Sequence, residues 1–278
     1  MKHFVARALL ALALAAPLAQ AQQAGAPAEQ RKRLDAVAQR YLAKSWPAPG
    51  PRVAGVALAQ VGERLPGWTV ETTVDPVRGE ARLRLAPEGG PVAVLATVRL
   101  FAEGAGARDA LLASLAGLQA TIDRAELGEV TYAGRVGDVP ALVFAARGNV
   151  FVSVRALDLE KPVDVLPAAR ALVALAGDGP ALAPGQPLLA PAVVDLRVVE
   201  GAVRAGQSAR LEVVSDPRGP AAAHLRFECE GDVSIVPLPD GGLELVAPTA
   251  GSYAVRVWAT SATLVAAAPV EMKVVVDP

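Results

Sequence analysis

The sequence predicts an α+β domain, in which helices pack on an antiparallel sheet, followed by an all-β sandwich domain. Before residue 178, apolar residues recur at helical spacing in three stretches and alternate with polar residues between them. After residue 192 the alternation continues without any helical period. Between the two parts, residues 179–191 space proline among glycine and alanine, which is typical of a semi-stiff linker. We therefore expect two domains joined by this segment.

Residues 1–21 have the features of a secretory signal peptide. Lys2 and Arg7 give a basic start, an apolar run follows, and Ala19-Gln20-Ala21 forms a small-x-small cleavage site. The apolar run is too short to span a bilayer of about 30 Å, and no later stretch reaches the roughly 20 apolar residues that a membrane helix needs. We therefore expect an exported protein, periplasmic or secreted, with no membrane span after cleavage.

Residues 22–52 are expected to form a lead-in, in which an amphipathic helix over 28–46 ends at a proline-rich stretch. The α+β domain should then occupy residues 53–178. A helix is predicted from residue 104 and another over 163–176, and Arg147-Gly148-Asn149 has the chemistry of a hairpin turn. The strands of this domain are predicted at 68–75, 81–85, 92–101, 141–146 and 150–157.

Residues 192–278 should form the sandwich, because short alternating runs are divided by glycine, proline and aspartate turns. The runs lie at 194–198, 210–213, 225–229, 243–245, 253–257 and 270–276. The stretch from Thr249 to Val257 resembles the G-x-Y-x-V-x-V segment of bacterial immunoglobulin-like and PKD-like domains. The resemblance covers residues 192–278 and implies an immunoglobulin-like sandwich in which Tyr253 forms a tyrosine corner. Val255 stands where antibody domains have a cysteine, which excludes the disulfide-bonded subclass.

Composition argues against several classes of function. The net charge is −1, and lysine and arginine are interleaved with aspartate and glutamate, so nucleic acid is not an expected partner. After removal of the signal, His224 is the only histidine and Cys229 the only cysteine. The usual zinc site of three or four nitrogen and sulfur ligands is therefore not expected. We predict no catalytic residue, no cofactor and no metal.

A candidate binding surface lies on the second domain. If Tyr253 faces the core, strand alternation turns Arg256 and Trp258 outward, and a neighbouring strand should place Arg226 and Glu228 beside them. Tryptophan and arginine are enriched at interface hot spots, so these four residues are the predicted binding site. The plainer interpretation, which we favour, is that Trp258 contacts the first domain or the linker.

Taken together, these features predict a non-enzymatic two-domain protein that serves protein interaction, adhesion or cell-envelope structure. Its partner would be an unknown protein or envelope component. One alternative is that the α+β domain binds a small molecule or a peptide in a cleft lined by Trp68. A weaker alternative is a hydrolase that relies on carboxylates alone, although pairs such as Glu228 with Glu230 are interpreted as exposed charge.

Overall fold

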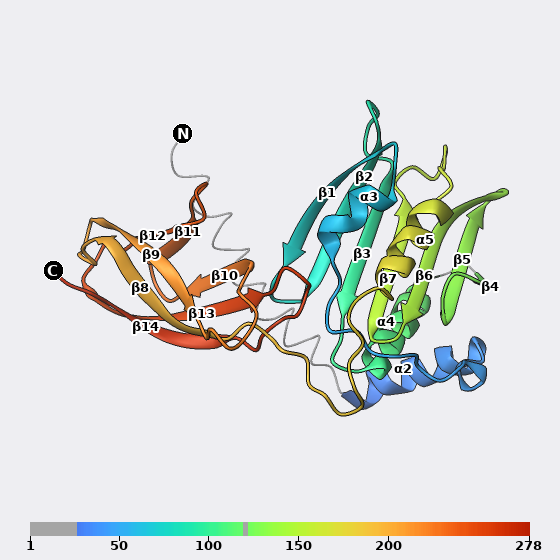
Figure 1. Cartoon of the computed structure of the whole chain (residues 1–278), viewed down its shortest axis with the longest axis horizontal. Coiled ribbons are helices and arrows are strands. Elements are labelled where there is room, and N and C mark those ends of the chain that lie inside the picture. Colours follow the sequence, from blue (N-terminus) through green and yellow to red (C-terminus); the bar gives the residue numbers. More distant parts are fainter. Residues whose placement is uncertain (1–26, 119–121) are drawn as a thin grey trace. The chain divides into compact units, whose positions relative to one another are not determined.

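The computed structural model describes residues 27–118 and 122–278, so the predicted signal peptide lies outside the described residues (Figure 1). These residues fall into two compact units. The small unit ends at Trp46 and also contains the segment from Leu112 to the gap. The large unit holds Pro47–Leu111 and the chain after the gap. Because α4 (Gly104–Ala116) passes from one unit into the other, the unit boundary does not coincide with the end of an element.

The small unit begins with α2 (Pro27–Arg40), followed by a 3₁₀ turn, η1 (Ala43–Ser45). The helix predicted over residues 28–46 is therefore shorter than expected. It stops because Leu42 adopts a left-handed conformation with φ of 52°, which cannot continue a right-handed helix. The Trp46 Nε1–H then donates to the Tyr41 carbonyl oxygen at 3.3 Å, which folds the chain back on itself.

A seven-stranded antiparallel sheet dominates the large unit, with strand order β1-β2-β3-β7-β6-β5-β4 (Figure 1). One face forms a core with α5 (Leu166–Leu175), with η2 (Leu58–Gln60) and with α3 (Val61–Arg64). Phe144 and Phe151 are buried on the opposite face, so the central strands are covered on both sides. The strands are β1 (Trp68–Asp75), β2 (Glu80–Pro87), β3 (Val94–Leu100), β4 (Asp123–Ala125), β5 (Val130–Val136), β6 (Val139–Arg147) and β7 (Val150–Ala156).

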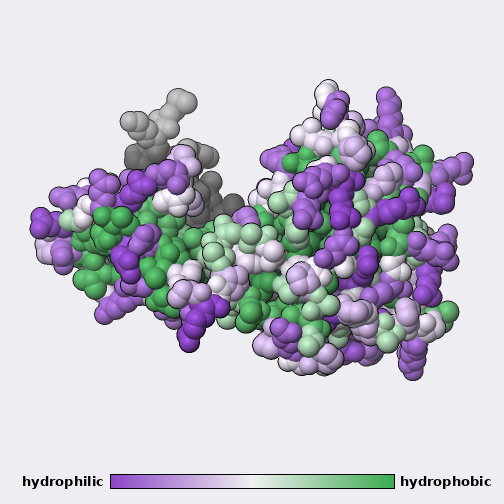
Figure 2. Space-filling view, viewed as in Figure 1, coloured by the Kyte–Doolittle hydropathy of each residue, from purple (hydrophilic) through white to green (hydrophobic). Residues whose placement is uncertain are grey.

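Two further antiparallel sheets follow, and they share a core that includes Leu211, Leu245 and Val257. The three-stranded sheet has the order β10 (His224–Cys229), β13 (Gly251–Thr260), β14 (Val270–Val276). The four-stranded sheet has the order β11 (Ser234–Pro237), β12 (Leu243–Val246), β9 (Ser208–Ser215), β8 (Val193–Gly201). Hydrophobic side chains reach the surface over these sheets (Figure 2), and Val194 and Val199 of β8 are among them.

The predicted fold class was wrong. The described structure is mostly β, with 41% strand and 18% helix, and consists of several antiparallel sheets with few helices rather than an α+β domain with packed helices. One reason is that β4 and β5 occupy a stretch for which no strand was predicted. Alternation is interrupted there by a register shift at Gly134, and Thr131 is buried. The helix predicted from residue 104 is α4, which ends at Ala116.

The first residues of the proline-rich segment (residues 179–191) pair with residues 52–54, which precede the large sheet. The Ala54 and Leu182 amides donate to the carbonyl oxygens of Pro180 and Arg52, each at 2.8 Å, and Val53 pairs with Ala181 in an isolated bridge. These bonds give the first residues of the segment fixed partners, whereas a free linker would have none. The division of the chain into domains at residues 179–191 stays a prediction.

The connection between β13 and β14 joins the core of the seven-stranded sheet. Leu264 in this connection is fully buried and belongs to the same core as α5. The Val56 amide donates to the Thr263 carbonyl oxygen at 2.9 Å, and a Cβ atom on Gly55 would lie only 2.5 Å from Cβ of Thr263. Glycine is therefore required at position 55 for this close approach. Leu264 has φ of 67°, which a leucine adopts only where its surroundings hold it there.

Candidate functional site

The four residues predicted as a binding site come together on the three-stranded sheet. The register of β10 and β13 places Arg226 opposite Trp258 and Glu228 opposite Arg256. Arg226, Glu228 and Arg256 are exposed and Trp258 is half-buried, whereas Val255 and Val257 between them are buried. The alternation that the sequence indicated therefore holds along β13. We call this surface the Arg256 face.

Arg256 is the electrostatic centre of this face. Its Nη2 lies 2.5 Å from Oε1 of Glu271 on β14, and its Nη1 lies 3.7 Å from Oε2 of Glu228. The hydrogen bond to Glu271, together with the charge of that carboxylate, raises the pKa of Arg256 above its usual value. The guanidinium carbon is 5.9 Å from the centre of the Trp258 ring, within the range of a cation–π contact. The face therefore combines a fixed cation, two carboxylates and an aromatic ring.

Sequence reasoning missed Glu271. Its position opposite Arg256 depends on the register between β13 and β14, and these strands are separated by the long connection that carries Leu264. Alternation along one strand predicts which residues face outward. It does not predict which residue of the next strand lies opposite, because a shift of two residues preserves the faces and changes every partner.

A shallow cavity of about 240 Å³ adjoins Arg256. It is lined by Glu228, Cys229, Glu230, Ala254, Arg256 and Glu271. Trp258 and Arg226 do not line it. Cys229 is half-buried, and burial raises the pKa of its thiol, which keeps the sulfur protonated and weakly nucleophilic at neutral pH.

His224, at the start of β10, is half-buried opposite Thr260. Burial lowers the pKa of its imidazole, so the side chain is mainly neutral at pH 7. Among the described residues, no group of three or more His, Cys, Asp and Glu side chains is placed to hold a metal ion. None of the helices in the described ranges is both long enough and apolar enough to cross a membrane.

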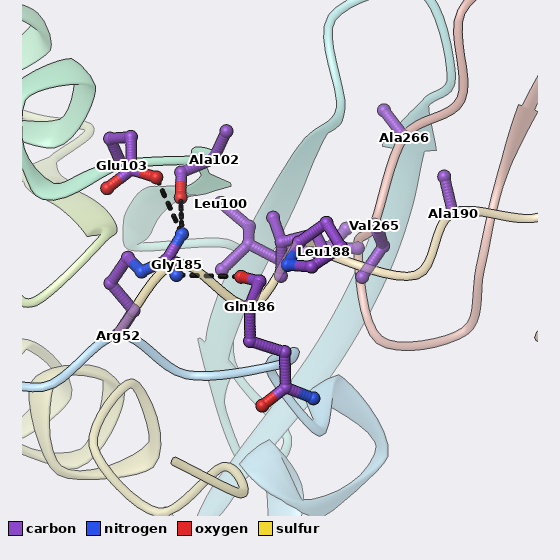
Figure 3. Close-up of a pocket in the computed structure, with 12 residues that line it drawn as sticks. Arg52, Leu100, Ala102, Glu103, Gly185, Gln186, Leu188, Ala190, Val265 and Ala266 are labelled. Atoms are coloured by element: carbon purple, nitrogen blue, oxygen red, sulfur yellow. Dashed lines mark hydrogen bonds and ion pairs between the residues drawn. The ribbon is translucent and has the colours of Figure 1, made fainter. Parts of the chain in front are cut away.

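A larger cavity, of about 480 Å³, lies elsewhere in the large unit (Figure 3). The end of β3, the proline-rich segment and the β13–β14 connection supply its walls. Its apolar lining consists of Leu100, Ala102, Pro187, Leu188, Ala190, Leu264, Val265 and Ala266. Trp68 does not line it, and a cleft at Trp68 stays a prediction. We call this cavity the Arg52 pocket.

Arg52 lies at the polar end of the pocket, with its guanidinium between Glu103 and Gln186 (Figure 3). Its Nη1 donates to the Ala102 carbonyl oxygen at 2.8 Å and to Oε1 of Glu103 at 2.7 Å. Its Nη2 donates to the Gln186 carbonyl oxygen at 2.7 Å. The Arg52 side chain is only 12% exposed, whereas that of Glu103 is 69% exposed. The cation is therefore largely buried, whereas its carboxylate partner is mostly exposed.

Comparison with known proteins gives no relative for this chain: no family model matches it, and no curated protein or solved structure does. The resemblance of residues 192–278 to immunoglobulin-like and PKD-like domains therefore stays a prediction. The Tyr253 hydroxyl donates to the Thr249 carbonyl oxygen at 2.9 Å, which is the kind of contact that a tyrosine corner implies.

Proposed function

We propose that the protein is an exported, non-enzymatic interaction protein that binds a partner protein through the Arg256 face. The observation that carries this proposal is the pairing of Arg226 with Trp258 next to the pair of Glu228 with Arg256. Tryptophan and arginine contribute most to binding when they lie together at the centre of an interface. Export is proposed from the signal sequence at residues 1–21.

The charges of the face indicate the chemistry of the partner. Arg256 already has two carboxylate neighbours, whereas Arg226 forms no ion pair within the described residues. A partner that offers a carboxylate to Arg226 and an apolar group to Trp258 would match both residues. We expect a protein segment in which an acidic residue lies beside an aromatic or aliphatic one. Such binding should weaken with added salt because the ion pair is exposed.

The competing interpretation is that Trp258 contacts the rest of the protein. Within the described residues, the hydrogen bonds from the β13–β14 region to the large sheet are made by Thr260 and Thr263, which contact Pro76 and Val56. Trp258 takes no part in these bonds. Its side chain is half-buried on the three-stranded sheet, where its ring contacts the guanidinium of Arg256.

The test is capture of partners from a periplasmic extract by the wild-type protein and by Trp258→Ala and Arg226→Glu variants. Both variants should keep the wild-type circular dichroism spectrum and lose the same captured protein. Arg197→Glu serves as a matched control, because Arg197 is an exposed arginine on β8, away from this face. If both variants capture the protein as well as the wild type does, or if Arg197→Glu loses it equally, the Arg256 face is not the binding site.

A second candidate function is the binding of a small carboxylate with an apolar tail in the Arg52 pocket. The specific observation is a largely buried guanidinium at the end of an apolar cavity of about 480 Å³, whose only carboxylate partner in the described part of the chain is largely exposed. This volume is within the usual range for small-molecule sites. A ligand carboxylate could take the place of Glu103 on Arg52, while its tail contacts Leu100 and Leu188.

Calorimetric titration with octanoate tests this candidate. Glu103→Gln should strengthen binding, because it removes the charge that competes for Arg52, and Leu188→Trp should abolish binding by filling the cavity. Octanol, which has the tail without the carboxylate, is the matched ligand control and should bind much more weakly. Absence of octanoate binding to the wild type and to Glu103→Gln would exclude this candidate and leave the Arg256 proposal unaffected.

A further inference from the structure

Among residues 27–118 and 122–278, no strand pairs with the outer edge of the first strand of the seven-stranded sheet. In the strand order, β1 has β2 as its only neighbour, and Figure 1 shows it as an outer strand. Apart from Glu71 and Asp75, its sequence, WTVETTVD, consists of β-branched and aromatic residues, which favour extended structure. All eight residues pair with β2 without a register shift. The strand is therefore long, regular and able to accept a further strand.

The other sheet edges among the described residues are shorter or are interrupted. β4 has three residues, β11 has four and ends in Pro237, and β10 has six. β14 carries Lys273, and β8 has two register shifts. Lysine, proline, bulges and short strands are the usual devices that prevent edge-to-edge pairing. β1 has none of them, and its only charged residues are Glu71 and Asp75.

The hydrogen-bond pattern shows which backbone groups face this edge. The Glu88 amide donates to the Gly67 carbonyl oxygen at 2.9 Å, so these residues form a hydrogen-bonded pair just beyond the strand. Hydrogen-bonded and non-hydrogen-bonded pairs alternate in an antiparallel ladder. Thr69, Glu71 and Thr73 therefore bond to β2. Val70, Thr72 and Val74 direct their amide and carbonyl groups toward the open edge.

We propose that β1 pairs antiparallel with β1 of a second copy of this chain, so that the two sheets become continuous. The acidic residues select the register. In the register that places Glu71 opposite Glu71 of the other copy, two like charges meet. In the register that places Thr73 opposite Thr73, Glu71 of each copy lies opposite Asp75 of the other, so like charges meet twice. With Thr72 opposite Thr72, Glu71 meets Thr73 and Asp75 meets Thr69, so every carboxylate faces a threonine. Like charges directly opposite each other destabilise a sheet, so this third register is favoured.

This register also satisfies the backbone and the apolar side chains. Thr72 pairs with Thr72 of the other copy, and Val70 pairs with Val74 of the other copy. The residues whose amides face the open edge therefore become hydrogen-bonded pairs. Val70 and Val74 pack against the core at this edge, and the pairing brings them into contact across the interface. Because strand pairing alone buries a small area, we expect a weak, concentration-dependent dimer.

Analytical ultracentrifugation of the purified protein from low to high micromolar concentration tests the proposal. The wild type should show a monomer–dimer equilibrium, and Thr72→Lys, which puts two lysines opposite each other, should raise the dissociation constant by about tenfold or more. Thr69→Lys is the matched control. Thr69 is exposed on the same strand and would meet Asp75 of the other copy, so this variant should dimerise at least as well as the wild type.

A cross-linking experiment checks the register without a change of charge. In a Cys229→Ser background, Thr72→Cys places two cysteines at the twofold axis, where the Cα atoms would be about 5.5 Å apart and a disulfide can form. Thr73→Cys should not cross-link, because its neighbour is Glu71. A wild type that stays monomeric over the whole concentration range overturns the proposal. Equal dimerisation of the Thr72→Lys variant, or cross-linking through Thr73→Cys instead, also overturns it.

Discussion

At the scale of single residues, Asn149 does more than its place in a hairpin indicated. The turn Gly148-Asn149 joins β6 and β7 where the sequence predicted it, since Arg147 pairs with Val150. The fully buried Asn149 side chain also accepts from the Val53 amide at 2.8 Å and donates to the Phe101 carbonyl oxygen at 2.8 Å. One amide therefore ties the hairpin to two distant segments.

We expect Asn149→Ala to lower the free energy of unfolding by about 2–4 kcal/mol, because the Val53 and Phe101 backbone groups lose their buried partner. Urea unfolding followed by circular dichroism measures the change. Thr73→Ala, at an exposed position of β1, is the control and should cost less than about 0.5 kcal/mol. A cost for Asn149→Ala as small as that of the control would mean that water replaces the amide.

Cys229 should react slowly with a thiol reagent in the native protein and rapidly in urea. Its side chain packs against the shared core of the two C-terminal sheets, and burial raises the pKa of the thiol. Native labelling followed by mass spectrometry at neutral pH measures the rate. Labelling as fast as that of the unfolded chain would show that the thiol is open to solvent through the cavity beside Arg256.

The imidazole of His224 should make stability depend on pH. Burial lowers its pKa in the folded protein below the usual value of 6.5. Between these two pKa values the unfolded chain binds more protons, so the contribution of His224 is present above about pH 6.5 and is lost as the pH falls toward the folded pKa. His224→Gln should therefore lose less stability than the wild type when urea unfolding is compared at about pH 7.5 and pH 5.5. Equal losses would contradict the assigned shift.

At the scale of elements, local signals predicted strands with clear alternation and failed where partners are distant in sequence. β1 was predicted with its observed bounds, Trp68–Asp75. In the candidate site, Arg226 and Glu228 were predicted beside Arg256 because adjacent strands preserve faces. The ion pair of Arg52 with Glu103 was not predicted, since no local pattern relates residues 51 positions apart. The contribution of Leu264 to the first core was missed for the same reason.

Leu264→Ala should destabilise the protein by about 2–4 kcal/mol, because it removes a fully buried side chain from the core of the large sheet. Val275→Ala is a suitable control, since Val275 is 59% exposed on β14 and should have little effect. Both values come from urea unfolding. A cost below about 1 kcal/mol for Leu264→Ala would mean that the β13–β14 connection does not fill that core.

At the scale of the whole molecule, the proline-rich segment exposes the chain between the seven-stranded sheet and the two C-terminal sheets, whereas the β13–β14 connection packs these parts together. The segment contains the exposed part of the chain between the large sheet and β8, where Leu189 is 64% exposed. Its earlier residues are held by Arg52, which bonds to the carbonyl oxygens of Ala183 and Gln186. The connection passes back across this junction and places Leu264 in the first core. The seven-stranded sheet and the C-terminal sheets are therefore linked twice, once by the covalent chain and once by the packing of Leu264.

Limited proteolysis with chymotrypsin should cut after Leu188 or Leu189 and spare the residues held by Arg52, because cleavage needs an exposed segment that can leave its partners. After the cut the two fragments should elute together from a size-exclusion column, because the β13–β14 connection still packs against Gly55. Gly55→Val should separate the fragments, because a Cβ atom at position 55 would lie only 2.5 Å from Cβ of Thr263. Gly62→Val is the matched control, since nothing lies within 4 Å of a Cβ atom there. Fragments of the wild type that separate at once would show that the connection does not hold the two sides together.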